Sequence, residues 1–126
     1  MNFNNSVIDW KQVDNVISSS NRILLTTHEN PDGDGLGSEV AMYHHLCDEK
    51  KDVKIINCSI TPLMFDYINE GGCIETYNES NHLEWLKKCE LVIVFDVGDF
   101  NRTREVKDVV ERFNTVSYTH LRAHET

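Results

Sequence analysis

Residues 27–38 hold the most informative stretch of the chain, Thr27-His28-Glu29-Asn30-Pro31-Asp32-Gly33-Asp34-Gly35-Leu36-Gly37-Ser38. The stretch follows the apolar run 23–25, which is typical of a buried strand, and it precedes residues with helical spacing. Its proline and glycines suit a tight turn, because proline fixes its own φ and glycine accepts positive φ. The stretch therefore predicts a strand, a turn and a helix, with His28, Asp32 and Asp34 gathered in the turn.

The rest of the chain alternates helical and strand-like segments. Helical spacing or capping residues favour helices over 7–19, from 36 to a charged run at 48–52, and over 61–67, 81–88 and 103–113. Apolar runs favour strands over 23–27, 53–58 and 91–95, and a further strand beginning at 114–116. This alternation predicts an α/β domain with a mostly parallel sheet flanked by helices.

Length and charge limit the classes of function. The chain has 126 residues and a formal net charge of −9, so we expect one domain and no broad, charge-driven binding to nucleic acid or anionic membranes. A phosphate substrate stays open, because bound cations can reverse the sign of the local field. Residues 1–5 show no signal peptide, and no apolar run approaches membrane-spanning length. The sequence predicts a soluble, cytoplasmic protein with no membrane partner.

The cysteines and the remaining histidines give weaker signals. Cys47, Cys58, Cys73 and Cys89 are widely spaced without a CxxC pair, which favours small buried side chains over a zinc site or a disulfide framework. His44 and His45 lie in the middle of a predicted helix and are expected at the surface, as is His82 near a helix start.

Polar side chains follow two apolar strands at the point where each strand ends. His28, Asp32 and Asp34 follow the first, and Asp96 directly follows the apolar run 91–95. Parallel sheets bind ligands beyond the carboxyl ends of their strands, so Asp96 would face the other three if the two strands are neighbours. One imidazole and three carboxylates suit Mn²⁺ or Mg²⁺ and supply enough oxygen for two ions.

Ordinary turns are the alternative. Asp32-Gly33 alone is a common turn dipeptide, and the run 96–99 alone would pass as a strand-to-loop turn. The His-x-x-x-Asp-x-Asp spacing together with a second acidic strand end favours a metal site over two unrelated turns.

Two segments resemble the signature motifs of the DHH phosphoesterases. Residues 24–38, which include the stretch quoted above, resemble the first motif, and Val94-Phe95-Asp96-Val97-Gly98-Asp99-Phe100-Asn101-Arg102 resembles the second. The resemblance covers residues from about 7 to 116. Its nearest branch is the nanoRNase type, an oligoribonuclease with 3′-phosphoadenosine-5′-phosphate phosphatase activity.

The resemblance implies that His28, Asp32, Asp34 and Asp96 are manganese ligands and catalytic residues. His28 and Asp32 would serve one ion, Asp34 would bridge, and Asp96 would complete the pair. The implied chemistry is two-metal hydrolysis of a phosphoester, in which the cations activate a water and stabilise charge on the phosphoryl oxygens.

Three further residues are candidates for phosphate binding. Gly37 and Ser38, at the start of the predicted helix, would offer backbone N–H groups to an anion. Arg102 would neutralise the charge of a phosphate, and an exposed ion pair is an equally open alternative for this residue.

The end of the chain departs from the family pattern. After the strand that corresponds to the one near Val116, DHH phosphoesterases have an Asp-His-His motif, a later aspartate and a separate C-terminal substrate-binding domain. This chain instead continues as Ser117-Tyr118-Thr119-His120-Leu121-Arg122-Ala123-His124-Glu125-Thr126. That decapeptide resembles translated sequencing-adapter sequence. We therefore expect an N-terminal part of a DHH domain over 1–116, a non-native tail over 117–126, and an inactive fragment that binds metal weakly. The intact enzyme, with a homodimer as one possibility, would act on short RNA or phosphorylated nucleotides.

Two alternatives stay open. Another branch of the same superfamily, such as inorganic pyrophosphatase or cyclic-dinucleotide phosphodiesterase, would keep the metal chemistry and change the substrate. A non-catalytic binding module would keep the fold, but such a module has no physical reason to retain His28, Asp32, Asp34 and Asp96 together.

Overall fold

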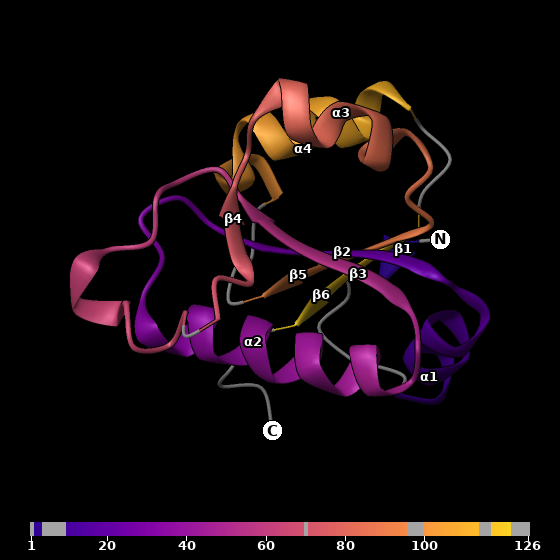
Figure 1. Cartoon of the computed structure of the whole chain (residues 1–126). Coiled ribbons are helices and arrows are strands. Elements are labelled where there is room, and N and C mark those ends of the chain that lie inside the picture. Colours follow the sequence, from indigo (N-terminus) through magenta and orange to yellow (C-terminus); the bar gives the residue numbers. More distant parts are fainter. Residues whose placement is uncertain (1, 4–9, 70, 96–99, 114–116, 122–126) are drawn as a thin grey trace.

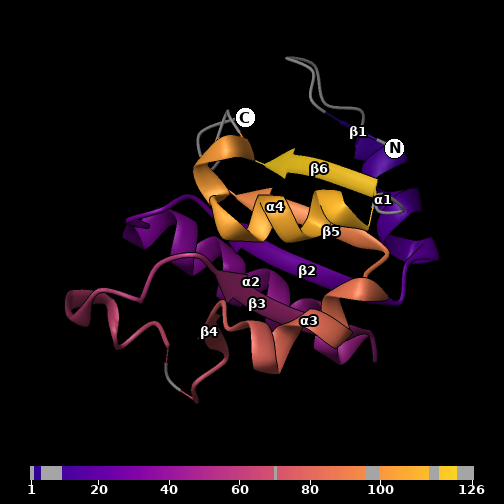
Figure 2. The same cartoon turned by 90° about the horizontal axis from the view of Figure 1, so that it is seen from above.

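The computed structural model describes residues 2–3, 10–69, 71–95, 100–113 and 117–121. Within these ranges the strands form one parallel sheet in the order β1-β6-β5-β2-β3-β4, which Figure 2 shows from above. The strands are β1 Asn2–Phe3, β2 Arg22–Thr27, β3 Asp52–Asn57, β4 Ile74–Thr76, β5 Leu91–Phe95 and β6 Ser117–Leu121.

Helices cover both faces of the sheet. Figure 1 shows α1 and α2 on one face and α3 and α4 on the other. The helices are α1 Trp10–Ser19, α2 Gly33–Asp48, α3 Glu79–Lys87 and α4 Glu105–Arg112, and two short 3₁₀ helices are η1 Leu63–Phe65 and η2 Phe100–Thr103. The predicted fold class, a parallel α/β sheet flanked by helices, is confirmed.

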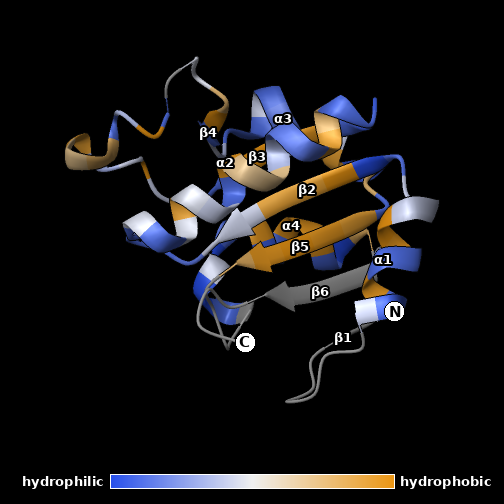
Figure 3. Cartoon of the chain, turned by 90° about the horizontal axis from the view of Figure 1, so that it is seen from below, coloured by the Kyte–Doolittle hydropathy of each residue, from blue (hydrophilic) through white to orange (hydrophobic). Residues whose placement is uncertain are grey.

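The central strands are apolar because both of their faces are covered. Figure 3 shows β2 and β5 as hydrophobic along most of their length. Ile23 and Leu25 pack into the core under α1 and α2, whereas Leu24 between them packs into the core under α3 and α4. All three are fully buried, and burial of each such side chain stabilises the fold by about 1.5–3 kcal/mol. The alternation fixes the register of β2, since a shift of one residue would exchange the two cores.

Helix α2 begins at Gly33, three residues before the predicted start at Leu36. Asp32 is its N-cap: the backbone of this residue is extended, and its Oδ1 accepts a hydrogen bond from the Gly35 N–H at 3.0 Å. An aspartate at this position satisfies an N–H group that has no partner inside the helix, so the helix can start directly after it despite its glycines.

Other boundaries also differ from the predicted ones. The three-residue strand β4 was not predicted, because it is short and its pairing with β3 is non-local. Helix α3 begins at Glu79 rather than 81, since Asn78 caps it by accepting from the Asn81 N–H at 3.2 Å. The helix predicted over 61–67 is limited to η1 and the turns that follow it.

The sheet continues into β6, whose backbone pairs with β5 and β1. The sequence predicted a strand from 114–116 that would not extend beyond 116; residues 114–116 lie outside the described residues, and β6 spans 117–121. Strand pairing uses main-chain N–H and C=O groups, so residues of many kinds can occupy such a position. The domain boundary at 116 and the non-native tail stay predictions.

Burial of the cysteines and histidines differs from residue to residue. Cys89 is buried as predicted, but Cys58 and Cys73 are half-buried and Cys47 is exposed. His44 and His45 are exposed, as expected. The prediction for His82 is wrong: it is 2% exposed, its Nε2 lies 2.9 Å from Glu75 Oε1, and its Nδ1 accepts from the Asn78 N–H at 2.9 Å. Among the described residues, no helix has the length and apolar character needed to cross a membrane.

Candidate metal site at the carboxyl ends of β2 and β5

The two strands that precede the candidate ligands are neighbours in the sheet. Thr27, the last residue of β2, pairs with Phe95, the last residue of β5, and the Thr27 hydroxyl donates to the Phe95 carbonyl oxygen at 2.7 Å. The sequence left the adjacency of these strands as a condition, and the structure meets it, since β2 pairs with β5 side by side (Figure 2). His28 and Asp96 are therefore the residues that follow a matched pair. Asp96 itself lies outside the described residues.

His28 is held in one orientation directly after β2. Its side chain is buried at 8% exposure, and its Nδ1 lies 2.6 Å from the Glu29 carbonyl oxygen. A carbonyl can only accept, so Nδ1 donates its hydrogen and Nε2 is the acceptor nitrogen of the neutral ring. Histidines that bind metals are commonly fixed in this manner by a hydrogen bond from the other ring nitrogen.

Asp32 and Asp34 are exposed at the start of α2. Carboxylates are favoured there, because the N-terminus of a helix carries partial positive charge. Within the part of the chain that the structure describes, no three His, Cys, Asp or Glu side chains are grouped closely enough to hold a metal ion. The arrangement brings the backbones of His28, Asp32 and Asp34 to one turn, while the Asp32 carboxylate is directed to the Gly35 N–H.

The earlier start of α2 changes the basis for phosphate binding by Gly37 and Ser38. Both residues lie in the second turn of the helix, where N–H groups bond to the carbonyl oxygens four residues back. An anion at the helix end would instead meet N–H groups of the first turn, such as those of Gly33 and Asp34. A role for Gly37 and Ser38 stays a prediction.

Residues of η2 and α4 lie beside the His28 turn. Arg102 is exposed, and its carbonyl oxygen accepts from the Glu29 N–H at 2.8 Å. Arg104 was missed in the sequence: its Nε lies 2.6 Å from Glu29 Oε2 and its Nη2 lies 2.8 Å from Glu29 Oε1. This hydrogen-bonded guanidinium lowers the pKa of Glu29. The pair joins positions 75 residues apart, so no local pattern could have revealed it.

A buried polar pair lies behind the turn, and it too was missed. Asn57, the last residue of β3, accepts from the Thr27 N–H through Oδ1 at 3.2 Å and donates through Nδ2 to Glu39 Oε1 at 2.9 Å. One feature of the sequence could have revealed this pair: an acidic residue stands at position 39, three residues after Leu36 on the apolar face of α2.

The donor types fit a hard divalent cation. An imidazole nitrogen and carboxylate oxygens are ligands for Mn²⁺ and Mg²⁺, and no cysteine belongs to the turn. Asp32 and Asp34 would hold such an ion together with His28, and Asp96 is the predicted fourth ligand. Both aspartates are exposed, so their carboxylates are accessible to an ion from solvent.

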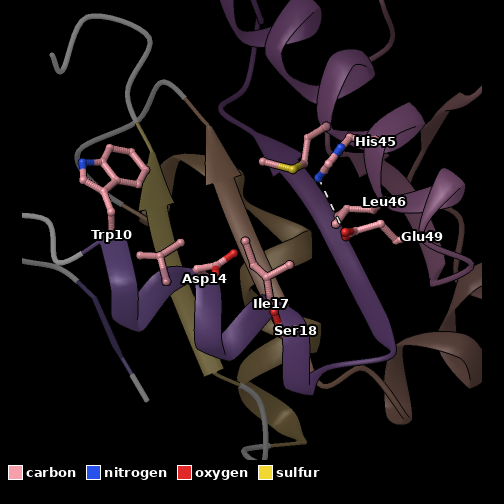
Figure 4. A pocket seen from close by; sticks show the side chains of 9 residues that line it. Trp10, Asp14, Ile17, Ser18, His45, Leu46 and Glu49 are labelled. Carbon is pink, nitrogen blue, oxygen red and sulfur yellow. Dashed lines mark ion pairs between the residues drawn. The ribbon is translucent and has the colours of Figure 1, made fainter.

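A groove between α1 and α2 contains none of the predicted site residues. Its lining includes Trp10, Asp14, His45 and Glu49. Figure 4 shows this lining, with His45 and Glu49 joined as an ion pair at 3.8 Å. His45 and Glu49 lie at the C-terminal end of α2, whereas Asp32 caps its N-terminal end. The groove is therefore separate from the candidate metal site.

The fold and the site together define a class: a parallel α/β domain with candidate ligands at the point where the strand order reverses, between β2 and β5. The family model for the N-terminal domain of the DHH family matches residues 22–121. The chain belongs to the DHH family of phosphoesterases, which confirms the resemblance found in the two motifs.

A solved structure supports the fold. The crystal structure of an exopolyphosphatase-related protein from Bacteroides fragilis is similar, with a TM-score of 0.78 and 21% sequence identity. The similarity covers 91% of this chain and 35% of that protein, so the chain spans about a third of its length. At this identity the likeness concerns the fold alone. Among curated proteins, no relative matches the chain.

Proposed function

We propose that this chain supplies metal-binding residues of a Mn²⁺-dependent phosphoesterase that hydrolyses short oligoribonucleotides, 3′-phosphoadenosine 5′-phosphate, or both. The observation that carries the proposal is the pairing of Thr27 with Phe95, because it makes His28 and Asp96 the next residues of two adjacent strands. Family membership supports phosphoester hydrolysis as the reaction class. The choice of nucleotide substrates rests on the resemblance of the two motifs to the nanoRNase branch.

In this proposal each residue of the turn has a defined task. His28 offers Nε2 to a cation because Nδ1 is occupied by the Glu29 carbonyl. Asp32 and Asp34 supply negative charge that holds the cation at the helix start, and Asp96 adds a carboxylate from the neighbouring strand. Divalent cations in such a site supply an activated water near neutral pH and neutralise the phosphoryl oxygens. Arg102, which is exposed in η2, would attract a phosphate.

The chain by itself is proposed to be inactive, with the remaining ligands and the substrate-binding domain supplied by a longer, cytoplasmic protein. The test begins with resequencing of the source DNA across the codon for Val116 and onward. The encoded protein and the 126-residue chain are then assayed with Mn²⁺ on a short oligoribonucleotide, 3′-phosphoadenosine 5′-phosphate, pyrophosphate and a cyclic dinucleotide.

The proposal predicts an in-frame Asp-His-His sequence and hydrolysis of one or both of the first two substrates by the longer protein alone. Hydrolysis restricted to pyrophosphate or to the cyclic dinucleotide would assign the chain to another branch of the superfamily. A genuine end at Thr126, combined with absence of Mn²⁺ binding, would leave the non-catalytic binding module as the correct alternative. Release of nucleotides by the 126-residue chain would contradict its proposed inactivity.

A further inference from the structure

A carboxyl group is buried below the candidate metal site, and its contact among the described residues is with a neutral amide. Glu39 is completely buried on the face of α2 that packs against the sheet, two helical turns after the cap residue Asp32. Its Oε1 accepts from Asn57 Nδ2 at 2.9 Å, and its Oε2 is a buried atom that has no hydrogen-bond partner in the described part of the chain. A buried polar group of this kind costs free energy that an apolar side chain of similar size would avoid.

The contacts of Asn57 lead from Glu39 to the residue before His28. Asn57 Oδ1 accepts from the Thr27 N–H at 3.2 Å, and Thr27 is the last residue of β2. The Thr27 hydroxyl in turn donates to the carbonyl oxygen of Phe95, the residue before Asp96. The chain of contacts Glu39–Asn57–Thr27–Phe95 therefore joins α2 and three strands directly behind the turn that holds the candidate ligands.

Glu39 contributes to the orientation of the Asn57 amide together with the Thr27 N–H and the Thr26 hydroxyl, which both donate to Asn57 Oδ1. An amide can rotate by a half-turn, which exchanges its oxygen and nitrogen. Because Glu39 accepts from Nδ2, the oxygen of Asn57 is directed to the Thr27 N–H rather than away from it. Burial raises the pKa of Glu39 to about 8, so the group is mostly neutral at neutral pH and adds little charge of its own to the site. The effect of Glu39 on the site is therefore its contribution to the orientation of the Asn57 amide.

We propose that Glu39, acting through Asn57, is a positioning residue that holds the end of β2 so that His28 meets a divalent cation in the correct geometry. The proposal rests on the proposed function, since it assigns a supporting role to residues that touch neither the cation nor the substrate. It goes beyond that function by locating the support in a helix face and a strand that carry none of the predicted ligands.

The test compares two substitutions of similar size. Glu39→Gln keeps a carbonyl oxygen that can accept from Asn57, whereas Glu39→Met fills the same space without any acceptor. Mn²⁺ affinity is measured by the paramagnetic resonance signal of free Mn²⁺, and folding is checked by thermal unfolding. Loss of a hydrogen bond that supports a metal ligand from outside typically weakens metal binding by about 10–100-fold. Glu39→Met should therefore weaken Mn²⁺ binding at least about 10-fold relative to the unsubstituted chain, called the parent below. The Mn²⁺ affinity of Glu39→Gln should stay within about twofold of that of the parent.

Hydrogen exchange of the Thr27 amide in the metal-free protein gives a second readout. The amide should exchange faster in Glu39→Met than in the parent, and at the parent rate in Glu39→Gln. Glu39→Asp, whose carboxyl is withdrawn from Asn57 by one methylene, serves if Glu39→Met does not fold, with the same expected result. Glu49→Met, an exposed glutamate just after α2, is the matched control and should change neither quantity.

The outcomes separate the two proposals. If the parent chain binds no Mn²⁺ and its end at Thr126 is genuine, the proposed function fails, while the Thr27 exchange rates still test the positioning role. If the parent binds Mn²⁺ and a folded Glu39→Met or Glu39→Asp binds it equally well, the positioning role is overturned and the metal site stands. Equal losses in Glu39→Gln and Glu39→Met would also overturn it, because the amide of glutamine can replace the acceptor.

Discussion

Asp32 has one observed role, as a helix cap, and one predicted role. Its carboxylate caps α2 through the Gly35 N–H, and the same carboxylate is a predicted metal ligand. A carboxylate has two oxygens with several lone pairs, so capping and metal binding do not exclude one another. Substitutions at Asp32 can separate them, because serine caps a helix about as well as aspartate but carries no charge.

Asp32→Ser and Asp32→Ala should therefore differ in stability and agree in metal binding. Asp32→Ala should lower the free energy of unfolding by about 1 kcal/mol relative to Asp32→Ser, because only serine satisfies the N–H at the helix start. Both should weaken Mn²⁺ binding by at least about 10-fold, as expected for loss of a ligand. Urea unfolding and Mn²⁺ titration check the two statements. Equal Mn²⁺ affinity in Asp32→Ser and the parent would remove Asp32 from the ligand set.

Glu39 makes the stability of the fold depend on pH. Burial raises its pKa in the folded chain to about 8, against 4.5 for an ordinary glutamate. Between these values the folded state holds a proton that the unfolded state has released, so the stability contributed by the neutral carboxyl is complete below about pH 4.5 and is lost as the pH rises toward 8.

Glu39→Gln should remove this dependence, since glutamine does not titrate. Between about pH 5 and about pH 8 the free energy of unfolding of the parent should fall relative to that of Glu39→Gln, by at most about 1.4 kcal/mol per pH unit. Urea unfolding at several pH values measures the difference, with Glu49→Gln as the exposed control. Parallel pH profiles of the parent and Glu39→Gln would show that Glu39 is ionised in the folded chain.

Single residues differ in how far the sequence reveals them. The place of His28, Asp32 and Asp34 in one turn after a strand could be predicted from their spacing behind an apolar run, and their role as metal ligands stays a prediction. The burial of Glu39 and His82 could not be predicted, since each depends on a hydrogen bond to another element, with Asn57 for Glu39 and with Glu75 for His82. Their environments depend on tertiary contacts, and polarity alone predicts exposure for both.

At the scale of elements, the turn after β2 is tied to the segment that leads into α4. The Glu29 N–H donates to the Arg102 carbonyl, and the Arg104 guanidinium makes two hydrogen bonds to the Glu29 carboxylate. Arg104 also has φ of 53° and ψ of −120°, a backbone conformation that favours glycine. The side chain thus compensates for local backbone strain at the start of α4.

Arg104→Gly and Arg104→Ala both remove the pair with Glu29, but only glycine relieves the backbone. Arg104→Gly should therefore be more stable than Arg104→Ala by about 1 kcal/mol. Thermal or urea unfolding of the two variants measures this difference, and both should show faster hydrogen exchange at the Glu29 amide than the parent. Arg104→Ala as stable as Arg104→Gly would contradict the assigned strain.

Elements with strong local signals could be predicted from the sequence. The strands around 23–27 and 91–95 and the helices that became α1, α2 and α4 rest on apolar runs or helical spacing. Their exact starts could not be predicted, because Asp32 and Asn78 act as caps only once the chain before each helix is extended. Strand β4 has three residues and depends on pairing with β3, so it has no periodic pattern to detect.

At the scale of the whole molecule, the order of the strands in the sheet determines where the candidate site lies. β2 lies between β5 and β3, so the chain leaves β2 toward one edge of the sheet and returns on the other side as β5. The carboxyl ends of β2 and β5 then flank the point where the order reverses, which is where open parallel sheets bind ligands. The sequence alone predicted parallel strands, whereas the neighbours of each strand follow from packing across the whole chain.

Mn²⁺ titration of the 126-residue chain tests the central claim most directly, with His28→Ala as the site variant and Asp14→Asn, which removes a negative charge in the groove between α1 and α2, as the control for surface charge. We predict weak but saturable binding by the parent, unchanged binding by Asp14→Asn, and a loss of at least about 10-fold in His28→Ala. Equal binding by all three proteins would show that the cation is held by surface charge, and would contradict a metal site at the ends of β2 and β5.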